Sequence, residues 1–181
     1  MGSVSGAVWT ASGRFGSALS FDGVNDWVTV PDASSLDLTT GMTVEAWVRP
    51  AALGGWRTVV FKERPGGVVY GLYADQAAGR PLGQVYIGSE RSAIGTSALP
   101  LNVWSHLATT FDGSVVRLFV NGVLVGTSSI SGSMTASTGV LRIGGNSIWS
   151  EWYAGLIDEV RVYSRALTAA ELQQDMQTPV G

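Results

Sequence analysis

The chain contains no cysteine, which excludes disulfide bonds and thiolate metal centres. Charged residues make up only 14% of the sequence and the net charge is −3, with a single lysine, Lys62. Nucleic-acid partners are recognised by clustered lysine and arginine, so we expect none here. No apolar run approaches the length of a membrane span, and we expect no membrane insertion.

Apolar residues and glycine are abundant instead. Hydrophobic residues account for 45% of the 181 residues, and there are 24 glycines. This composition favours one large core with many tight turns, so we expect a single domain over residues 1–181, with residues 1–10 and 177–181 as flanking tails. The start at Met1 has neither a positive segment nor an apolar segment, so we expect any export signal to lie outside this sequence.

Alternation of apolar and polar residues predicts antiparallel strands along most of the chain. Residues 43–49 alternate clearly, and so do residues 107–111, 115–120 and 123–128. Asp112-Gly113 and Asn121-Gly122 separate the last three segments, and both dipeptides are typical of hairpin turns. These segments therefore predict a three-stranded meander.

One short helix is expected near the C-terminus. Thr168 and Glu171 have the spacing of a capping box, and Leu172 and Met176 continue an apolar face. We expect Leu167, Leu172 and Met176 to cover one edge of the sheets. The predicted fold class is all-β, a two-sheet antiparallel jelly-roll sandwich with one short C-terminal helix.

Six motifs in a fixed order carry a family resemblance. They are Gly16-Ser17-Ala18-Leu19-Ser20-Phe21-Asp22-Gly23, Asp26-Trp27-Val28-Thr29-Val30-Pro31, Met42-Thr43-Val44-Glu45-Ala46-Trp47-Val48, Trp104-Ser105-His106-Leu107-Ala108, Val120-Asn121-Gly122, and the stretch from Gly155 to Leu167. Together they resemble the laminin-G-like domains of the concanavalin A-like lectin and glucanase superfamily, over roughly residues 14–175. The resemblance implies two curved antiparallel sheets, an extracellular or cell-surface location, binding of a glycan or another partner, and a structural calcium ion.

Oxygen donors gather where the two ends of the chain are expected to meet. Asp22, Asn25 and Asp26 share one turn with the carbonyl of Gly23, and Asp158 joins them if the last strand pairs with the first. Calcium takes such oxygen ligands, so these five residues are the candidate metal site. In the alternative, Asp22 forms an Asx turn and Asp158 caps a strand end.

Seven tryptophans offer a second candidate site. Trp27, Trp47 and Trp104 lie in strand patterns, where packing is the default role. Trp56, Trp149 and Trp152 lie in loops, and exposed indoles stack on sugar rings. With nearby polar groups, the predicted ligand-binding residues are Trp56, Arg57, Glu90, Arg91, Asn146, Trp149, Glu151 and Trp152. Burial of Trp152 and Tyr153 is the alternative.

Catalytic residues are not predicted. The related glucanases use a Glu-x-Asp-x-x-Glu arrangement that this sequence lacks, and the adjacent Asp158 and Glu159 face apart on a strand. Ser105 and His106 also face apart, which favours a structural role for the one histidine. We therefore expect a non-catalytic carbohydrate-binding or adhesion module. The alternative is a structural or protein-interaction module that contacts other domains of its parent protein and binds no glycan.

Overall fold

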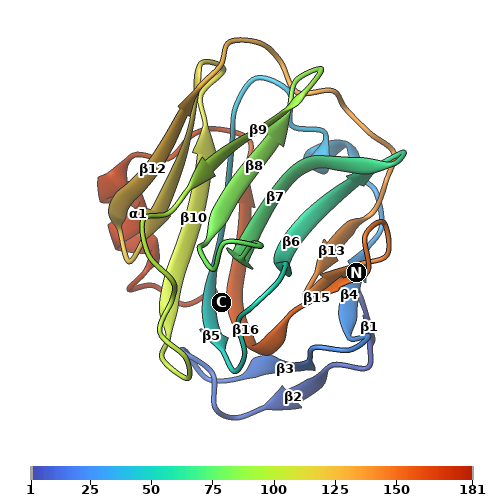
Figure 1. Ribbon diagram of the computed structural model, residues 1–181, viewed down its shortest axis with the longest axis vertical. Helices are drawn as coiled ribbons and strands as arrows, with labels where there is room; N and C mark the ends of the chain where they lie inside the picture. Colours follow the sequence, from blue (N-terminus) through green and yellow to red (C-terminus); the bar gives the residue numbers. More distant parts are fainter. Residues whose placement is uncertain (1, 181) are drawn as a thin grey trace.

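The computed structural model describes residues 2–180 and shows two antiparallel sheets packed face to face as a sandwich (Figure 1). A short helix, α1 (Ala169–Asp175), lies beside one sheet, and a 3₁₀ turn, η1 (Ser34–Leu36), follows β4. The predicted all-β sandwich with one short C-terminal helix is confirmed. Within residues 2–180, no helix is long and apolar enough to span a membrane.

The first sheet, which we call the front sheet, has seven strands. In spatial order they are β1 (Ser3–Ser5), β4 (Trp27–Val30), β13 (Leu141–Ile143), β6 (Arg57–Arg64), β7 (Gly67–Asp75), β8 (Leu82–Tyr86) and β9 (Glu90–Ile94). A two-stranded hairpin of β14 (Gly145–Asn146) and β15 (Glu151–Trp152) follows β13.

The second sheet, the back sheet, also has seven strands. In spatial order they are β12 (Val123–Ser129), β11 (Val115–Val120), β10 (Ser105–Phe111), β5 (Met42–Pro50), β16 (Ala154–Tyr163), β3 (Ala18–Asp22) and β2 (Val8–Thr10). The helix α1 packs on the outer face of this sheet, where Leu167 and Leu172 contact Ala108 and Phe119.

Alternate residues of both sheets build the core between them. On β5, Val44, Ala46 and Val48 are fully buried in this core, as the period of two predicts. The sheets approach so closely at β8 that a Cβ atom on Gly83 would lie 2.1 Å from the Thr109 hydroxyl oxygen. Because the space between the sheets is filled here, we look for a ligand-binding site on the outer faces.

The first and last motif strands lie side by side, as expected. β3 pairs with β16 in antiparallel register, with Phe21 opposite Gly155 and Asp22 opposite Ala154. The predicted meander is also present, because β10, β11 and β12 are consecutive neighbours. Asn121 and Gly122 have positive φ angles of 51° and 74°, as a type I′ hairpin turn requires.

The two ends of the chain differ from the expectation of flanking tails. Residues 3–5 pair with β4 in the front sheet, and residues 8–10 pair with β3 in the back sheet. At the other end, Thr178 accepts a hydrogen bond from Arg161, and the backbone of Val180 donates to Glu159. Met1 and Gly181, which belong to the predicted tails, lie outside the described residues.

The C-terminal helix forms as its sequence predicts, but its apolar residues pack on the outer face of the back sheet and not on a sheet edge, where we expected them. The Thr168 hydroxyl accepts from the backbone of Glu171, whose carboxylate accepts from the backbone of Thr168. This capping box satisfies two amide groups that a helix start otherwise leaves unpaired. Leu172 is fully buried beneath the helix, so α1 is held to the sheet by apolar packing.

Candidate functional site

A hollow of about 240 Å³ lies on the outer face of the front sheet. Its lining residues are Trp56, Gln84, Glu90, Trp149 and Glu151. Four of these five are among the predicted ligand-binding residues, although they come from loops and strands far apart in sequence. We refer to this hollow as the tryptophan hollow.

Two half-exposed indoles border the tryptophan hollow. Trp56 is 38% exposed and Trp149 is 40% exposed. Trp56 meets the buried ring of Tyr73 edge to face at 5.3 Å, and Trp149 meets the buried ring of Phe61 at 5.4 Å. Phe61 and Tyr73 contact each other at 6.5 Å, so a row of four aromatic rings crosses β6 and β7. The two end rings of this row are open to a ligand.

Asn146 fixes the wall that carries Trp149. Its side-chain amide donates to Glu151 at 2.8 Å and to the Thr58 hydroxyl at 2.9 Å, and its oxygen accepts from the backbone of Trp149 at 2.9 Å. Asn146 is fully buried, and these three hydrogen bonds to protein groups occupy its side chain. The structure therefore gives Asn146 a positioning role beneath the hollow, where the sequence predicted a direct ligand contact.

The carboxyl group of Glu151, on β15, is partly buried. Burial raises its pKa, while hydrogen bonds from Asn146 and Thr58 partly offset that effect. Glu90, on β9, is the more exposed acid, with the Arg64 guanidinium at 3.9 Å. The hollow thus presents two carboxyl groups, one amide from Gln84 and two indoles, and no basic side chain from residues 2–180 lines it.

Besides Asn146, three predicted ligand residues do not line the hollow. Glu151 and Trp152 are adjacent on β15, so their side chains point to opposite sides, and Trp152 packs against Trp27 at 5.1 Å. Arg57 donates to the backbone carbonyls of Trp152 and Gly54, which makes it a brace for the loops. Arg91 is exposed and donates to the carbonyl of Glu90.

Sequence reasoning missed Gln84, Tyr73 and Phe61. Gln84 is a single polar residue in the otherwise apolar strand β8, and that break in the pattern was the available signal. The Tyr73 hydroxyl is buried without a hydrogen-bond partner, and burial together with the nearby carboxylates of Glu151 and Glu90 raises its pKa. No signal in the sequence distinguishes Tyr73 from the core tyrosines.

The candidate calcium residues fall into two groups. Asp22, Gly23, Asn25 and Asp26 share the turn between β3 and β4, where Asp22 accepts from the backbone of Val24 and Asp26 accepts from that of Asp22. Asp158 lies four residues beyond Ala154, the partner of Asp22, which is roughly 13 Å along the strand at about 3.3 Å per residue. Its carboxylate instead accepts from the backbone amides of Phe15 and Glu159. The register therefore keeps Asp158 away from the turn.

Among residues 2–180, no three His, Cys, Asp or Glu side chains gather in a group that could hold a metal ion. The Asn25 side chain and backbone carbonyls also have oxygen atoms that can bind a cation, although they are not ionisable. Asp22, Asn25 and Asp26 bring three oxygen-bearing side chains to the turn between β3 and β4, where Asp22 also accepts the backbone hydrogen bonds of an Asx turn, and Asp158 does not belong to that set.

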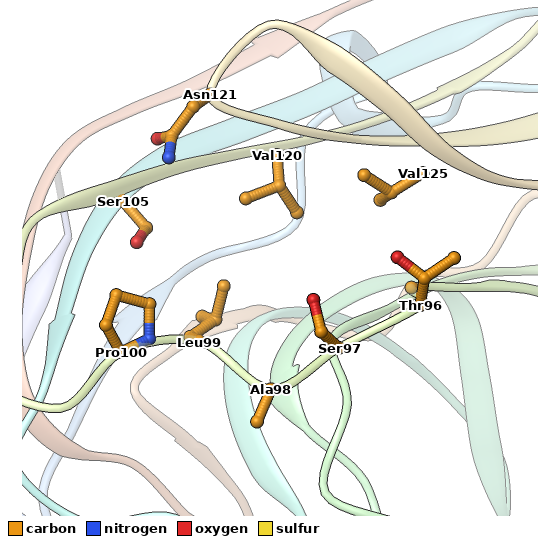
Figure 2. A pocket seen from close by; sticks show the side chains of 10 residues that line it. Thr96, Ser97, Ala98, Leu99, Pro100, Ser105, Val120, Asn121 and Val125 are labelled. Carbon is orange, nitrogen blue, oxygen red and sulfur yellow. The ribbon is translucent and has the colours of Figure 1, made fainter.

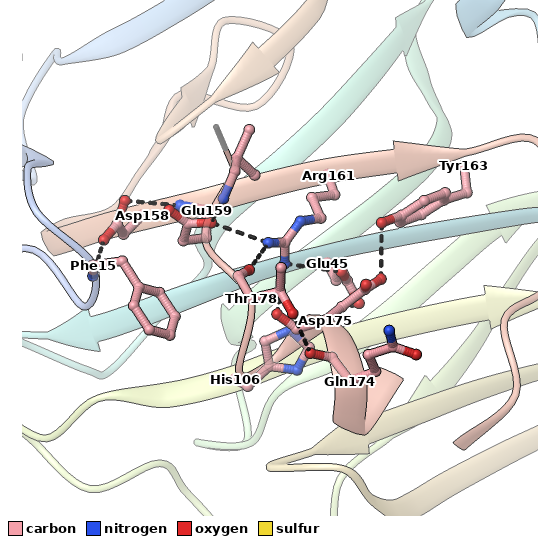
Figure 3. A network of polar contacts seen from close by, with 11 residues as sticks. Phe15, Glu45, His106, Asp158, Glu159, Arg161, Tyr163, Gln174, Asp175 and Thr178 are labelled. Atoms are coloured by element: carbon pink, nitrogen blue, oxygen red, sulfur yellow. Dashed lines mark hydrogen bonds and ion pairs between the residues drawn. The ribbon is translucent and has the colours of Figure 1, made fainter. Parts of the chain in front are cut away.

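A second cluster of ionisable residues lies on the outer face of the back sheet (Figure 3). Arg161 is 3.4 Å from Glu45, its cross-strand partner, and 3.1 Å from Glu159, and it donates to the carbonyl of Asp175. His106 lies 3.6 Å from Glu45 and is fully buried. We call these residues, with Tyr163, the back-face network.

Burial dominates the ionisation of the back-face network. Desolvation, reinforced by Asp175, raises the pKa of Glu45 to about 8 even though Arg161 opposes the shift. Desolvation and the Arg161 charge lower the pKa of His106 to about 4. At neutral pH Glu45 is therefore mostly protonated and His106 is neutral, so their contact is not an ion pair. This arrangement is closed by α1 and the C-terminal segment, which favours the predicted structural role for His106.

Known proteins share this architecture. Mouse pappalysin-1 is 29% identical over 157 residues, and the match covers 75% of this chain and 10% of that protein. Domain 4 of AbnA, a GH43 extracellular arabinanase from Geobacillus stearothermophilus in complex with arabinotriose, superposes with a TM-score of 0.72 at 22% identity, covering 97% of this chain and 88% of that one. A putative carbohydrate-binding protein from Bacteroides ovatus superposes with a TM-score of 0.69 at 24% identity, covering 90% of this chain and 47% of that one.

The family itself is established by the sequence. A laminin G family model described as the concanavalin A-like lectin/glucanases superfamily matches residues 22–173, which is most of the chain. The predicted resemblance is confirmed, and the chain belongs to the concanavalin A-like lectin/glucanases superfamily.

Proposed function

We propose that this chain is a non-catalytic carbohydrate-binding module and that its glycan binds in the tryptophan hollow. The observation that carries the proposal is the pair of half-exposed indoles, Trp56 and Trp149, beside the polar groups of Gln84, Glu90 and Glu151. Indole faces stack on the apolar faces of sugar rings, and carboxyl and amide groups accept hydrogen bonds from sugar hydroxyls. The buried Asn146 holds Trp149 and Glu151 in place for both tasks.

The charge of the hollow favours a neutral glycan. Two carboxyl groups line it and no basic side chain does, so a uronate or sialylated ligand would meet repulsion. Arg64 lies beside Glu90 but stacks its guanidinium 3.7 Å from the Tyr86 ring centre, outside the lining. We therefore expect neutral oligosaccharides to bind better than acidic ones.

Two structural neighbours support a glycan ligand. The arabinanase domain was observed with arabinotriose, a neutral oligosaccharide, and the Bacteroides ovatus protein is described as carbohydrate-binding. Arabinotriose is accordingly the first ligand to test. These proteins share the fold with this chain, and the tryptophan hollow is the feature of this chain that connects the fold to a ligand.

The test is a glycan array followed by calorimetric titration of the best ligand. Trp149→Ala and Trp56→Ala should each weaken binding by about 2 kcal/mol, roughly thirtyfold, as expected for a central aromatic contact. Trp9→Ala is the matched control, because Trp9 is 65% exposed and lies on β2, outside the hollow. Equal losses in all three variants, or preferred binding of acidic glycans, would contradict the proposal.

The competing function is a protein-interaction module without a glycan ligand. It predicts no binding on the array, together with protection of Trp149 by a neighbouring domain of the parent protein. Quenching of tryptophan fluorescence by acrylamide, measured in this domain and in the full-length parent, separates the two cases. Protection of Trp149 without any glycan binding favours the competitor.

A glycoside hydrolase is the remaining candidate, because Glu90 and Glu151 line the same hollow and burial raises the pKa of Glu151. Glycosidases need one carboxylic acid and one carboxylate on opposite sides of the scissile bond. In this chain Glu151 is tied to Asn146 and Thr58, which suits a fixed hydrogen-bond acceptor. Unchanged arabinotriose after prolonged incubation with the protein supports binding without cleavage, and release of arabinose contradicts it.

We also propose that a structural calcium ion binds at the β3–β4 turn through Asp22, Asn25, Asp26 and the carbonyl of Gly23. The support is three oxygen-bearing side chains in one short turn. A chelator should lower the melting temperature and calcium should restore it, because an ion bound only by the folded state stabilises that state. Asp22→Asn should abolish the calcium effect, and Asp158→Asn should leave it. An identical melting curve with chelator and with calcium contradicts this part.

We propose an extracellular or cell-surface location for the module. The arabinanase that contains the structural neighbour is described as extracellular, and a glycan-binding hollow is useful where polysaccharides are found. Its partners would then be a glycan or polysaccharide and the other domains of its parent protein. Fractionation of cells that express the parent protein tests this location.

A further inference from the structure

A second cavity, of about 200 Å³, lies between the connection from β9 to β10 and the β11–β12 hairpin (Figure 2). It shares no lining residue with the tryptophan hollow. β9 and β12 close the sandwich beside it, and they approach so tightly that a Cβ atom on Gly126 would lie 2.4 Å from the carbonyl oxygen of Ile94. The cavity is therefore bounded by packed strands on one side and by residues 95–100 on the other.

The floor of this cavity contains a buried hydroxyl group without a partner. Ser105 begins β10 and is fully buried, and its Oγ atom forms no hydrogen bond with any described protein group. A buried polar group left unpaired destabilises the folded state, so a ligand atom that bonds to Ser105 gains an interaction that the protein alone lacks.

The orientation of Asn121 adds a donor to the same cavity. Its side-chain oxygen accepts from the backbone of His106 at 2.8 Å, and its amide nitrogen makes no hydrogen bond to a protein group within residues 2–180. Figure 2 shows this nitrogen on the Ser105 side of the residue and the Ser97 hydroxyl pointing toward Val120. With Thr96, these residues supply neutral donors and acceptors around the cavity.

The remaining wall is apolar. Leu99, Val120 and Val125 line it, and none of the charged residues in the described part of the chain lines the cavity. The cavity opens to solvent, because Thr96, Ser97, Ala98, Pro100 and Asn121 are exposed. An enclosed cavity of roughly 150 Å³ with aliphatic walls holds a benzene ring, so the space here is large enough for one ring with a few polar substituents. A charged ligand would lose its hydration without gaining a partner.

We propose that this cavity binds an uncharged, ring-sized alcohol, with its ring against Val120 and Val125 and its hydroxyl on Ser105 and Asn121. The site is independent of the tryptophan hollow and of the glycan proposed there. Three probes of similar size separate the elements of the proposal: benzyl alcohol has the ring and the hydroxyl, benzene has only the ring, and benzoate carries a charge.

The experiment is an NMR titration of protein labelled at leucine and valine methyl groups. Benzyl alcohol should shift the signals of Leu99, Val120 and Val125, and benzoate should bind at least tenfold more weakly. Ser105→Ala should weaken benzyl alcohol about fivefold, the contribution of one neutral hydrogen bond, and leave benzene unchanged. Thr127→Ala, an exposed hydroxyl on β12 outside the cavity, is the matched control and should change neither probe.

Three outcomes overturn the proposal. The first is an absence of shifts at Leu99, Val120 and Val125, which means that the cavity holds only water. The second is equal binding of benzoate and benzyl alcohol. The third is a Ser105→Ala variant that folds as the original chain does and binds benzyl alcohol equally well. Trp149→Ala should leave the titration unchanged, so failure here and failure of glycan binding are separate results.

Discussion

A tryptophan is half-exposed on one outer face of the sandwich and buried on the other. On the front sheet, Trp149 is 40% exposed and borders a hollow. On the back sheet, Trp47 is 5% exposed, with the Arg14 guanidinium 4.5 Å from its ring centre and the His106 ring 5.3 Å away. The indole of Trp149 is accessible to a ligand because α1 does not cover the front sheet. The indole of Trp47 lies beneath neighbouring segments and packs against them.

The acidic residues of the two faces differ in the same way. Burial raises the pKa of Glu151 and of Glu45. Glu151 is held by the neutral donors Thr58 and Asn146 beside an open hollow, whereas Glu45 is enclosed with Arg161 and His106. A perturbed pKa alone therefore does not mark a site, because access to a ligand separates the two glutamates.

The largest expected effect comes from removing the packed indole. Trp47→Ala should lower the free energy of unfolding by about 3 kcal/mol, because truncating a buried aromatic side chain leaves a cavity. Glycan affinity should change less than twofold. Denaturant unfolding and calorimetric titration measure the two quantities, and a large loss of affinity in a folded variant would remove the distinction between the faces.

The opposite pattern is expected for the exposed indole. Trp149→Ala should cost about 2 kcal/mol of binding free energy and less than about 1 kcal/mol of unfolding free energy, because it loses mainly one edge-to-face contact with Phe61. The same two measurements apply. A strongly destabilised variant with unaltered affinity would assign Trp149 to packing.

The back-face network should give the protein a dependence on pH near neutrality. The pKa of Glu45 is about 8 in the folded protein against an ordinary 4.5, so the folded state holds an extra proton between these values; stability therefore falls as pH rises from 4.5 towards 8 and levels off above 8. The pKa of His106 is lowered from 6.5 to about 4, so its effect is opposite and ends above pH 6.5.

Between pH 6.5 and 8 the Glu45 effect therefore stands alone. The free energy of unfolding should fall there by up to about 1 kcal/mol per pH unit, and Glu45→Gln should flatten this slope. Glu171→Gln is the control, because hydrogen bonds from Arg165 and Thr168 lower the pKa of Glu171 to about 2, far from this range. Denaturant unfolding at several pH values measures the slope, and an unaltered slope in Glu45→Gln refutes the assignment.

The smallest effect concerns the helix that covers the back sheet. Thr168→Ala removes the capping box and should lower the free energy of unfolding by about 1 kcal/mol, with no change in glycan affinity. Thermal unfolding followed by circular dichroism measures the change. Thr168→Ser should recover most of the stability, and a loss as large in Thr168→Ser as in Thr168→Ala would show that the cap is not the cause.

Local signals in the sequence predicted much of this fold. The Asn121-Gly122 turn and the Thr168 capping box depend on neighbouring residues alone, and both formed as expected. The pairing of β3 with β16 was expected because the first and last strands of an antiparallel sandwich are often neighbours. By contrast, the three-residue strands β1 and β2 are too short to show an alternating pattern, so residues 1–10 were expected to be a tail.

The candidate site was predicted only in part, because several side-chain positions depend on strand register. Loop position alone identified Trp56 and Trp149, but the direction of a side chain on β15 depends on its register with β14, and this register turns Trp152 toward Trp27. The position of Asp158 depends in the same way on the register of β16 with β3. Contacts such as those of Asn146 join segments nearly ninety residues apart, with a separation of 88 to Thr58, and single-sequence patterns do not contain them.

The first ten residues have a practical consequence for anyone who moves this module into another protein. Ser3–Ser5 close one margin of the front sheet, and Val8–Thr10 close the matching margin of the back sheet. A fusion that starts at residue 11 would leave β4 and β3 with bare hydrogen-bonding groups on the same flank, which invites intermolecular strand addition. Chimeras should therefore retain this leading segment, and linkers should be attached ahead of it.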